Sequence, residues 1–255
     1  MTPRIRHPYL DHPGPIAFAH RGGAADGLEN TALQFRRAVE AGYRYLETDV
    51  HASADGRLVA FHDATLDRVT DGAGRIADLP WKDVRHARVA GKEPVPLFEE
   101  LLETFPDVRW NVDVKAEPAL SPLLELIERT NSWDRICVGS FAEARVVRAQ
   151  RLAGPRLATS YGTRGVLNLR LRSWGLPAAV RRSAVAAQVP EIQSGIQVVD
   201  HRFLRTAHAL GLQVHVWTVN EPERMHRLLD LGVDGIMTDH IDTLRKVMED
   251  RGTWV

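Results

Sequence analysis

A histidine and an arginine followed by two glycines end the first predicted strand of this sequence. The strand is Ile16–His20, and the run His20-Arg21-Gly22-Gly23 leads out of it. Glycines allow the backbone to approach a ligand closely, and the planar guanidinium of an arginine matches the oxygens of a phosphate. The run therefore fits a phosphate-binding turn, although a solvated surface turn would also accommodate it.

The second predicted strand, Tyr45–His51, carries two carboxylates on one face. Side chains alternate across a strand, so Glu47, Asp49 and His51 share a face with Tyr45, opposite to the apolar face. In a barrel this polar face points inwards. Two interior carboxylates are costly unless cations or a metal ion compensate them. His51 has the simpler role of orienting a neighbour.

The predicted strand Arg109–Lys115 repeats this pattern. Asn111, Asp113 and Lys115 alternate with valines and face inwards. Lysine occurs only at positions 82, 92, 115 and 246, so an inward lysine stands out. Lys115 either neutralises Asp113 as a structural pair or meets the phosphate of a substrate.

Two further residues at strand ends could take part in chemistry. His62 ends the short predicted strand Arg57–His62, where a histidine near carboxylates is a candidate general acid or base, or a structural residue. Trp217 lies in the strand Gln213–Val219 and faces inwards near its end. Core packing and stacking on an apolar part of a substrate are both open for this indole.

The order of predicted elements indicates how these residues are positioned. Strands and helices alternate about eight times, which predicts a parallel sheet covered by helices. The remaining strands are expected at Ile136–Ser140, Leu157–Tyr161, Val185–Val189 and Gly235–Thr238. The helices are expected at Asn30–Ala41 (capped by Asn30 or Thr31), Leu97–Phe105, Leu120–Thr130, Glu143–Leu152, Thr163–Arg182, Arg202–Leu210, Glu223–Leu231 and Asp242–Asp250.

The fold class predicted from this order is α/β, a (β/α)8 TIM barrel. The length of 255 residues matches such a barrel, which takes roughly 250 residues. A segment rich in Asp, Gly and Pro, at about 63–96, is predicted as a small insertion after the second strand. Residues 1–255 are expected to form a single domain. Active sites of such barrels lie at the carboxyl ends of the strands.

Composition excludes several classes of function. The formal net charge is zero, so no global charge attracts nucleic acid or an anionic membrane. The single cysteine, Cys137, cannot form an internal disulfide or a thiolate cluster, and we expect a small core residue. Residues 1–10 contain no apolar segment of a secretory signal, and no apolar run is long enough to span a bilayer. We expect a cytoplasmic protein without a transmembrane segment; its oligomeric state is unknown from sequence.

Taken together, the strand ends bring three carboxylates, two histidines, an arginine and a lysine towards one place. Carboxylates without thiolates favour a hard cation, Mg2+ or Ca2+. A hard cation beside an arginine, a lysine and two histidines suits phosphoryl transfer, in which cations balance charge and histidines move protons.

At this point the sequence resembles the glycerophosphodiester phosphodiesterase family, over about residues 16–245. The matching motifs are His20-Arg21-Gly22, Glu29-Asn30-Thr31, Glu47-Thr48-Asp49-Val50, Asp55-Gly56, Val59, His62-Asp63, Thr65-Leu66-Asp67-Arg68, Asp113-Val114-Lys115, Trp217-Thr218-Val219-Asn220 and Gly232-Val233-Asp234-Gly235-Ile236. Each motif is weak alone, but the ordered set is specific.

The resemblance implies hydrolysis of small-molecule glycerophosphodiesters to glycerol phosphate and an alcohol. It implies that Glu47, Asp49 and Asp113 bind one divalent cation. His20 and His62 would be the general base and acid, Arg21 and Lys115 would hold the phosphate, and Glu29 would brace Arg21. The implied route is attack by the adjacent glycerol hydroxyl, giving a cyclic phosphate that water opens.

One position departs from the family pattern, because many members have Glu where this chain has Asp113. The shorter side chain could shift the metal or add a bridging water. The Asp-x-Lys version is similar to the sphingomyelinase D toxins, which are secreted and disulfide-bonded, unlike this chain with its one cysteine.

Three alternatives remain beside this reading. The first is a lysophospholipase D that acts on lysophospholipids, which would need an apolar mouth formed by the insertion and Leu167–Trp174. The second is an amidohydrolase-type barrel, but none of the eleven histidines lie two positions apart to give its His-x-His pair. The third is a non-catalytic barrel, which would have lost some site residues. The sequence does not specify the alcohol.

Overall fold

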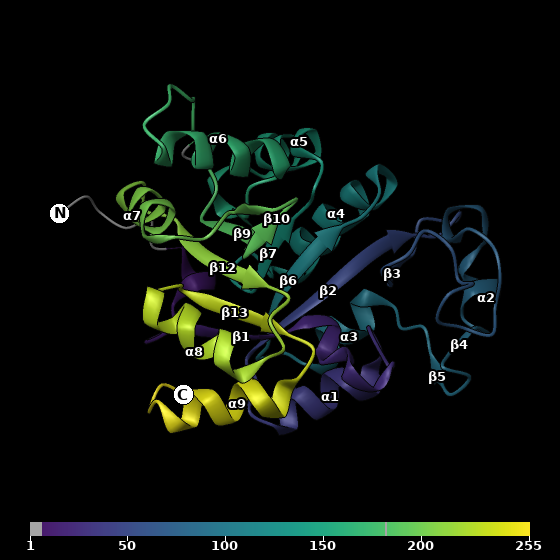
Figure 1. The fold of residues 1–255 in the computed structure, drawn as a ribbon. Helices are drawn as coiled ribbons and strands as arrows, with labels where there is room; N and C mark the ends of the chain where they lie inside the picture. Colours follow the sequence, from purple (N-terminus) through teal and green to yellow (C-terminus); the bar gives the residue numbers. More distant parts are fainter. Residues whose placement is uncertain (1–6, 182) are drawn as a thin grey trace.

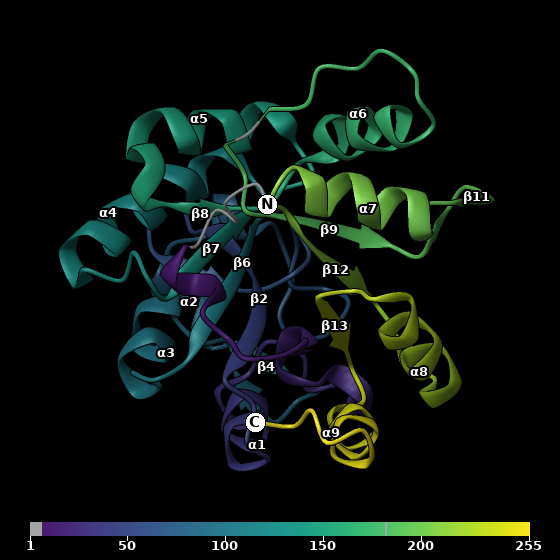
Figure 2. The same ribbon diagram turned by 90° about the vertical axis from the view of Figure 1, so that its left-hand side faces the viewer.

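The computed structural model describes residues 7–181 and 183–255, and eight parallel strands in it form a nearly closed barrel (Figures 1 and 2). The strands are β1 (Ile16–Ala19), β2 (Tyr45–Ala52), β6 (Arg109–Val114), β7 (Ile136–Gly139), β8 (Ala158–Thr159), β9 (Ala186–Pro190), β12 (Gln213–Trp217) and β13 (Gly235–Thr238). They are ordered β8-β7-β6-β2-β1-β13-β12-β9. The predicted TIM barrel is confirmed.

The barrel closes between β8 and β9, where the pairing is shortest. Ser160 and Ala186 form a single parallel bridge. Val185 N–H donates to Thr159 O at 2.9 Å, and Tyr161 N–H donates to Ala186 O at 3.0 Å. These bonds join the two ends of the strand order.

A helix follows each barrel strand and covers its outer face (Figure 2). The helices are α1 (Ala32–Glu40), α3 (Phe98–Thr104), α4 (Leu120–Thr130), α5 (Glu143–Ala153), α6 (Thr163–Ser173), α7 (His201–Ala209), α8 (Pro222–Leu231) and α9 (Ile241–Asp250). Their apolar faces and the outward strand residues form one core, which includes Leu46, Val50 and Trp110. Burial of this layer is the main force that holds the barrel.

Two of the barrel helices in the described residues begin with a side-chain cap, and for the first of them the sequence had offered Asn30 or Thr31. Thr31 caps α1, since its hydroxyl accepts a hydrogen bond from Gln34 N–H at 3.2 Å. Asp200 caps α7 in the same way through Phe203 N–H at 2.8 Å. These caps fix the residues at which α1 and α7 begin.

The interior of the barrel is filled at the end away from the mouth. A short 3-10 helix, Pro8–Leu10, places Tyr9 under the strands, and Tyr45 donates its hydroxyl to Tyr9 O at 2.7 Å. Phe18 packs against His215 with ring centroids 4.9 Å apart. This apolar floor leaves the other end of the barrel for polar residues. Cys137 is fully buried in the same cluster, as expected.

The segment after β2 leaves the barrel and has an apolar core of its own. Strand β3 (Leu58–Ala60) turns back and pairs antiparallel with β2, followed by α2 (Trp81–Val84), β4 (Arg88–Val89) and β5 (Glu93–Pro94). Val59, Phe61 and Leu66 belong to a buried cluster separate from the main core. Figure 1 shows this segment beyond the end of β2.

The structure corrects several predicted boundaries. The first strand ends at Ala19, and His20 already lies in a turn. The helix expected at Thr163–Arg182 ends at Ser173, and Arg182 lies outside the described residues, as do residues 1–6 at the amino terminus. Gly175, with a φ of 83°, follows the helix end. Among the described residues, no helix has the length and apolar character needed to cross a membrane.

We predict that His215 limits the stability of the protein in acid. Burial lowers its pKa from 6.5 to about 4, and its Nε2 bonds Gln213 Oε1 at 2.9 Å. The neutral ring therefore contributes stability above pH 6.5 that is lost as the pH falls towards 4, about 3 kcal/mol in all. His215→Gln should flatten the fall in the free energy of unfolding over this range, measured by urea titration.

The exposed His86 supplies the control for this measurement. His86→Gln should leave the pH dependence of wild type unchanged. Parallel curves for wild type and His215→Gln would contradict the assignment.

Candidate active site

The turn after β1 has a backbone that few sequences allow. Arg21, Gly22 and Gly23 have φ values of 50°, 82° and 96°, all in the left-handed region. A Cβ atom at Gly22 would lie 2.9 Å from Phe35 Cδ1, so glycine is required there. A non-glycine residue in this region costs free energy, and such residues cluster at functional sites. The turn places His20 and Arg21 over the carboxyl ends of the strands.

His20 lies between two carboxylates. Its Nδ1 is 2.7 Å from Asp239 Oδ1, and its Nε2 is 3.7 Å from Glu47 Oε2. Burial favours the neutral ring, but Glu47 and Asp239 outweigh that effect, so the pKa of His20 is raised. Asn220 Nδ2–H in turn donates to Asp239 Oδ2 at 3.1 Å.

Glu47 is a buried carboxyl with incomplete compensation. It is 5% exposed and accepts a hydrogen bond from Arg21 N–H at 3.0 Å. Burial, followed by repulsion from Asp49, raises the pKa of Glu47 to about 7. A nearby cation would stabilise the charged form of such a carboxyl.

Asp49 is compensated from three sides. Lys115 Nζ lies 2.8 Å from its Oδ1, Arg21 Nε lies 3.2 Å from its Oδ2, and Asn30 Nδ2–H donates to Oδ2 at 3.2 Å. Burial alone would raise the pKa of Asp49, but Lys115 and Arg21 lower it. The contact with Arg21 Nε is too poorly aligned for a hydrogen bond, so this buried N–H has no hydrogen-bond partner among the described residues.

Lys115 joins β2 to β6 across the mouth of the barrel. The strand register sets Asp49 opposite Asp113, and Lys115 Nζ lies 2.7 Å from Asp113 Oδ2. Both carboxylates raise the pKa of Lys115 against the opposite effect of burial, which is the largest single influence. Lys115 therefore pairs with Asp113, which is one of the two roles considered for it from sequence; the other is contact with a substrate phosphate.

The three carboxylates expected to bind a metal offer only oxygen donors, which suit Mg2+ or Ca2+. Within residues 7–181 and 183–255, no three acidic, histidine or cysteine side chains stand in a ligating arrangement. The ammonium of Lys115 lies between Asp49 and Asp113. Glu47, Asp49 and Asp113 carry the donor atoms that a hard cation uses, but here Lys115 takes the place between two of them, so their role as one ligand set is a prediction.

His62 is held by a series of ion pairs that connects it to Arg21. Its Nδ1 is 2.6 Å from Asp63 Oδ1, and Arg68 Nε–H donates to Asp63 Oδ2 at 2.5 Å. Arg68 also donates through Nη2 to Glu29 Oε1 at 2.7 Å, and Glu29 Oε1 accepts from Arg21 Nη1 at 3.0 Å. Glu29 thus braces Arg21, as the resemblance implied.

His51 supports the His62 end of this series of ion pairs. Its Nε2 lies 3.1 Å from His62 O and holds the backbone of His62. His51 therefore orients a neighbour, the simpler of the roles considered from sequence.

Trp217 stands at the rim of the mouth. It is half-buried against the inner core and meets Phe141 edge to face, with ring centroids 5.7 Å apart. Phe141 is 61% exposed, and Lys115 Nζ lies 5.6 Å from its ring centroid. The indole thus packs on the core while one edge reaches an exposed aromatic ring.

The site residues proposed from sequence all lie at one end of the barrel. Asp239 and Phe141 were not among them, and Asn30 and Asn220, which stand in the matching motifs, had been given no role in the site. Asp239, Asn220, Asn30 and Phe141 complete the contacts of the site. A signal existed for Asp239, which directly follows β13, and for Phe141, which follows β7. The rule that strand ends carry the site could have found both.

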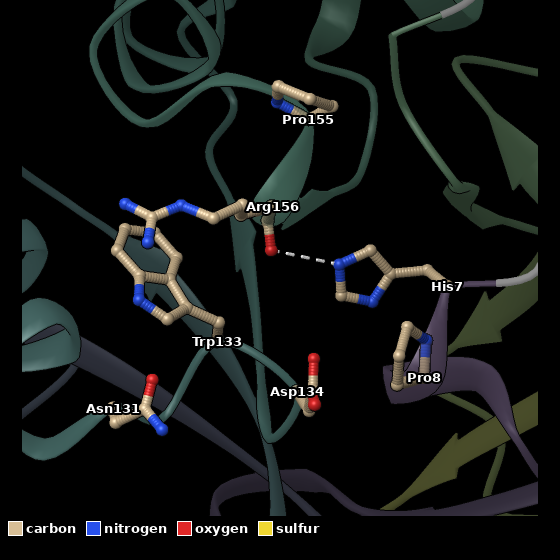
Figure 3. Close-up of a pocket in the computed structure, with 7 residues that line it drawn as sticks. All are labelled: His7, Pro8, Asn131, Trp133, Asp134, Pro155 and Arg156. Atoms are coloured by element: carbon tan, nitrogen blue, oxygen red, sulfur yellow. Dashed lines mark hydrogen bonds between the residues drawn. The ribbon is translucent and has the colours of Figure 1, made fainter.

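A hollow of about 410 Å³ lies elsewhere and does not belong to this site (Figure 3). Its lining comes from loops before β7 and β8 and from the amino-terminal segment, at the opposite end of the strands. The lining residues are His7, Pro8, Asn131, Trp133, Asp134, Pro155 and Arg156. His7 Nε2 bonds Arg156 O at 3.0 Å, and the Arg156 guanidinium lies over Trp133 at 4.2 Å.

Comparison with known proteins shows the family of the chain. Residues 20–243 match the model of the glycerophosphoryl diester phosphodiesterase family. A probable glycerophosphodiester phosphodiesterase of Mycobacterium tuberculosis is 42% identical over 96% of this chain and 95% of its own length. A human lysophospholipase D is 29% identical over 89% of this chain and 84% of its own length.

Solved structures share the fold. A putative glycerophosphoryl diester phosphodiesterase from Silicibacter pomeroyi has a TM-score of 0.78 and 24% identity, covering 98% of this chain and 100% of that one. A phosphodiesterase from Oleispira antarctica, solved with the product sn-glycerol-3-phosphate, has a TM-score of 0.77 and 22% identity, covering 92% and 97%.

The barrel and its relatives define a phosphoric diester hydrolase. The chain belongs to the glycerophosphoryl diester phosphodiesterase family.

We predict that Asp239 sets the protonation of His20. Asp239→Asn removes one of the two carboxylates that favour the imidazolium, so the pKa of His20 should fall. The measurement is an NMR titration of the His20 ring in the metal-free protein. Asp200→Asn, at the cap of α7, is the control and should leave the titration of His20 unchanged. An unaltered His20 pKa in Asp239→Asn would overturn the assignment.

Proposed function

We propose that this protein hydrolyses glycerophosphodiesters to glycerol phosphate and an alcohol, with His20 and His62 as the proton-transfer pair. The observation that carries the proposal is that each histidine is held through Nδ1 by an aspartate, at 2.7 Å by Asp239 and at 2.6 Å by Asp63. An aspartate at Nδ1 fixes the ring and leaves Nε2 for proton transfer.

The phosphate-binding part of the proposal rests on Arg21 and Lys115. The buried Nε–H of Arg21 is ion-paired with Asp49 Oδ2 at 3.2 Å but makes no aligned hydrogen bond within the described ranges, so its donor capacity is open to a phosphate oxygen. Lys115 is a cation at the mouth with a raised pKa, so it stays charged at neutral pH. An Arg fork and a Lys ammonium together suit a phosphodiester.

The proposed reaction takes two steps. In the first, one histidine accepts the proton of the glycerol hydroxyl next to the phosphate, and the hydroxyl oxygen bonds to phosphorus. The other histidine gives a proton to the departing alcohol as its bond to phosphorus breaks. In the second, the histidine that gave up its proton takes one from water, whose oxygen bonds to phosphorus. The P–O bond formed in the first step breaks, and the other histidine returns a proton to that glycerol oxygen, which regenerates both histidines. Glycerol phosphate is the product.

One divalent cation, Mg2+ or Ca2+, belongs to this proposal, with Glu47, Asp49 and Asp113 as the residues that would hold it. When bound, such an ion supplies positive charge against the developing negative charge of the phosphate. The raised pKa of Glu47 supports the proposal, because burial and repulsion from Asp49 destabilise its charged form and a nearby cation would offset both.

A second candidate substrate is a lysophospholipid, which carries the same diester and an acyl chain. Support comes from the human relative named lysophospholipase D and from the exposed ring of Phe141 beside Trp217. The relative from Oleispira antarctica, with its bound glycerol phosphate, supports the small diester. We also propose that residues 1–255 form a single domain; the cytoplasmic location stays a prediction.

The first experiment compares these substrates. Release of glycerol phosphate from glycerophosphocholine and from lysophosphatidylcholine is measured with EDTA, Mg2+ or Ca2+. Turnover of the small diester that EDTA abolishes supports the proposal. Turnover of the lipid alone reassigns the protein to the lysophospholipase D class, and turnover of neither substrate rejects both assignments.

We predict that His20→Ala and His62→Ala each lower kcat by about 10²- to 10⁴-fold, the contribution of general acid–base catalysis. Both rings are partly exposed, so the fold should persist, as circular dichroism would show. The matched control is His86→Gln on the exposed surface. Near-native rates in both alanine variants would remove the histidines from the mechanism.

We predict opposite effects of two neighbouring substitutions on metal affinity. Asp113→Ala removes an oxygen donor and should weaken Mg2+ or Ca2+ binding by about tenfold or more. Lys115→Ala removes the cation between Asp49 and Asp113, so it should leave metal binding intact or stronger and mainly raise KM. Isothermal titration calorimetry measures the affinities. Equal affinity in wild type and Asp113→Ala would exclude Asp113 from the ligand set.

A further inference from the structure

The chain has a strongly uneven distribution of charge that the active site does not use. Between Ala144 and Asn220 the sequence contains 11 arginines, no lysine and only two acidic residues, Glu191 and Asp200. Since the formal net charge of the chain is zero, the remaining residues are acidic by the same amount. The positive excess is concentrated in one continuous part of the barrel.

This part comprises the neighbouring helices α6 and α7 and all of α5 except its first residue, Glu143. Three of its arginines, Arg145, Arg148 and Arg156, pair with Glu117 and Glu128. Figures 1 and 2 both place α6 and the segment after it at the upper edge of the molecule. The two acidic residues do not neutralise the surface, because Glu191 bonds Arg224 and Arg227 of α8, and Asp200 bonds Arg170. Within the described part of the chain, the exposed side chains of Arg151, Arg164, Arg172 and Arg181 form no ion pair.

Apolar side chains lie among these free arginines. Leu167 is 54% exposed and Trp174 is 42% exposed, and their spacing of seven residues sets them on one face of α6. Arg164, three residues before Leu167, belongs to the same face. Leu176, directly after the helix, is 50% exposed. Large apolar side chains gathered on a surface mark an interaction site more often than single ones do.

Trp174 is held in place from below. The guanidinium of Arg170 lies 4.5 Å from its ring centroid, and Arg170 Nη2–H donates to Asp200 Oδ2 at 2.6 Å. Arg170 is itself buried, so the ring rests on a fixed base. An indole that is fixed at the surface loses little conformational entropy when it is covered.

We propose that this surface docks on an anionic phospholipid bilayer. We call it the α6 face and define it as the exposed side of α6 and the segment after it, with Arg164, Leu167, Arg172, Trp174, Leu176 and Arg181. The helical spacing sets Leu167 and Trp174 on one flank of this side and Arg172 on the other, with Arg164 between them. Guanidinium groups bind lipid phosphates, while leucine and tryptophan side chains enter the boundary between headgroups and acyl chains. A nucleic acid would satisfy the arginines but would leave Leu167 and Leu176 in water.

The α6 face is separate from the mouth of the barrel. Because α6 begins after β8, Arg164 lies at the mouth end of the helix, and Trp174 lies at the far end. Docking along α6 therefore lays the barrel on its side, so the mouth opens along the membrane plane. Such docking does not depend on which alcohol the enzyme releases.

The test is co-sedimentation with vesicles of phosphatidylcholine, with and without phosphatidylglycerol. Wild type should bind only the anionic vesicles, and added salt should weaken the binding. The variant R164Q/R172Q/R181Q should bind about a hundredfold more weakly, from a loss of about fivefold for each arginine. L167Q/L176Q should also weaken binding but keep its dependence on salt.

The matched control removes the same charge from other parts of the surface. R57Q/R75Q/R245Q alters two exposed arginines and one partly exposed arginine, each paired with an acid, and should bind the vesicles like wild type. Circular dichroism checks that each variant is folded. Vesicle binding can then be compared between variants whether or not any diester is hydrolysed. No binding of wild type to anionic vesicles, equal losses in both triple variants, or binding to duplex DNA in place of vesicles would overturn the proposal.

Discussion

The site depends on one constraint, which is that carboxylates are buried inside a barrel of parallel strands. Glu47 and Asp49 are 5% and 2% exposed, and a charged carboxylate at that depth requires compensation. The protein supplies it from two directions: Lys115 comes from the neighbouring strand and Arg21 from the turn after β1. The left-handed backbone of that turn, the two glycines and the register of β2 against β6 all serve to deliver those two cations.

The negative charges of Asp49 and Glu47 are compensated unequally, and their pKa values shift in opposite directions as a result. Asp49 receives an ammonium, a guanidinium and an amide, and its pKa is lowered. Glu47 receives a backbone N–H and the edge of His20, and its pKa rises to about 7. Two adjacent carboxyls with divergent pKa values are typical of catalytic sites, where a proton or a cation can be exchanged. A purely structural pair would be compensated on both sides.

Most of the inward-facing site residues could be predicted from sequence, because polar and apolar residues alternate along the strands that carry them. The alternation at Glu47 and Asp49, and again at Asp113 and Lys115, fixed which side chains faced inwards. The place of Asp239 after β13 was open to prediction, but its contact with His20 was not, and neither was that of Asn30 with Asp49, since both depend on how segments distant in sequence meet over the barrel. The end of α6 was also missed, because a run of mixed Leu and Arg residues continues beyond Ser173 without a clear stop before Gly175. Metal ligation depends on sub-ångström placement of Lys115 relative to the carboxylates, which no sequence pattern encodes.

The separate apolar core after β3 has a consequence for how activity and folding relate. His62 stands between Phe61 and Leu66, both anchored in that small cluster, whereas His20 belongs to the main barrel. The two proposed proton-transfer groups are therefore supported by cores of different size. A small core loses its order at a lower temperature than a large one. Heat would then inactivate the enzyme while the barrel is still folded, and cooling would restore activity without refolding of the whole chain.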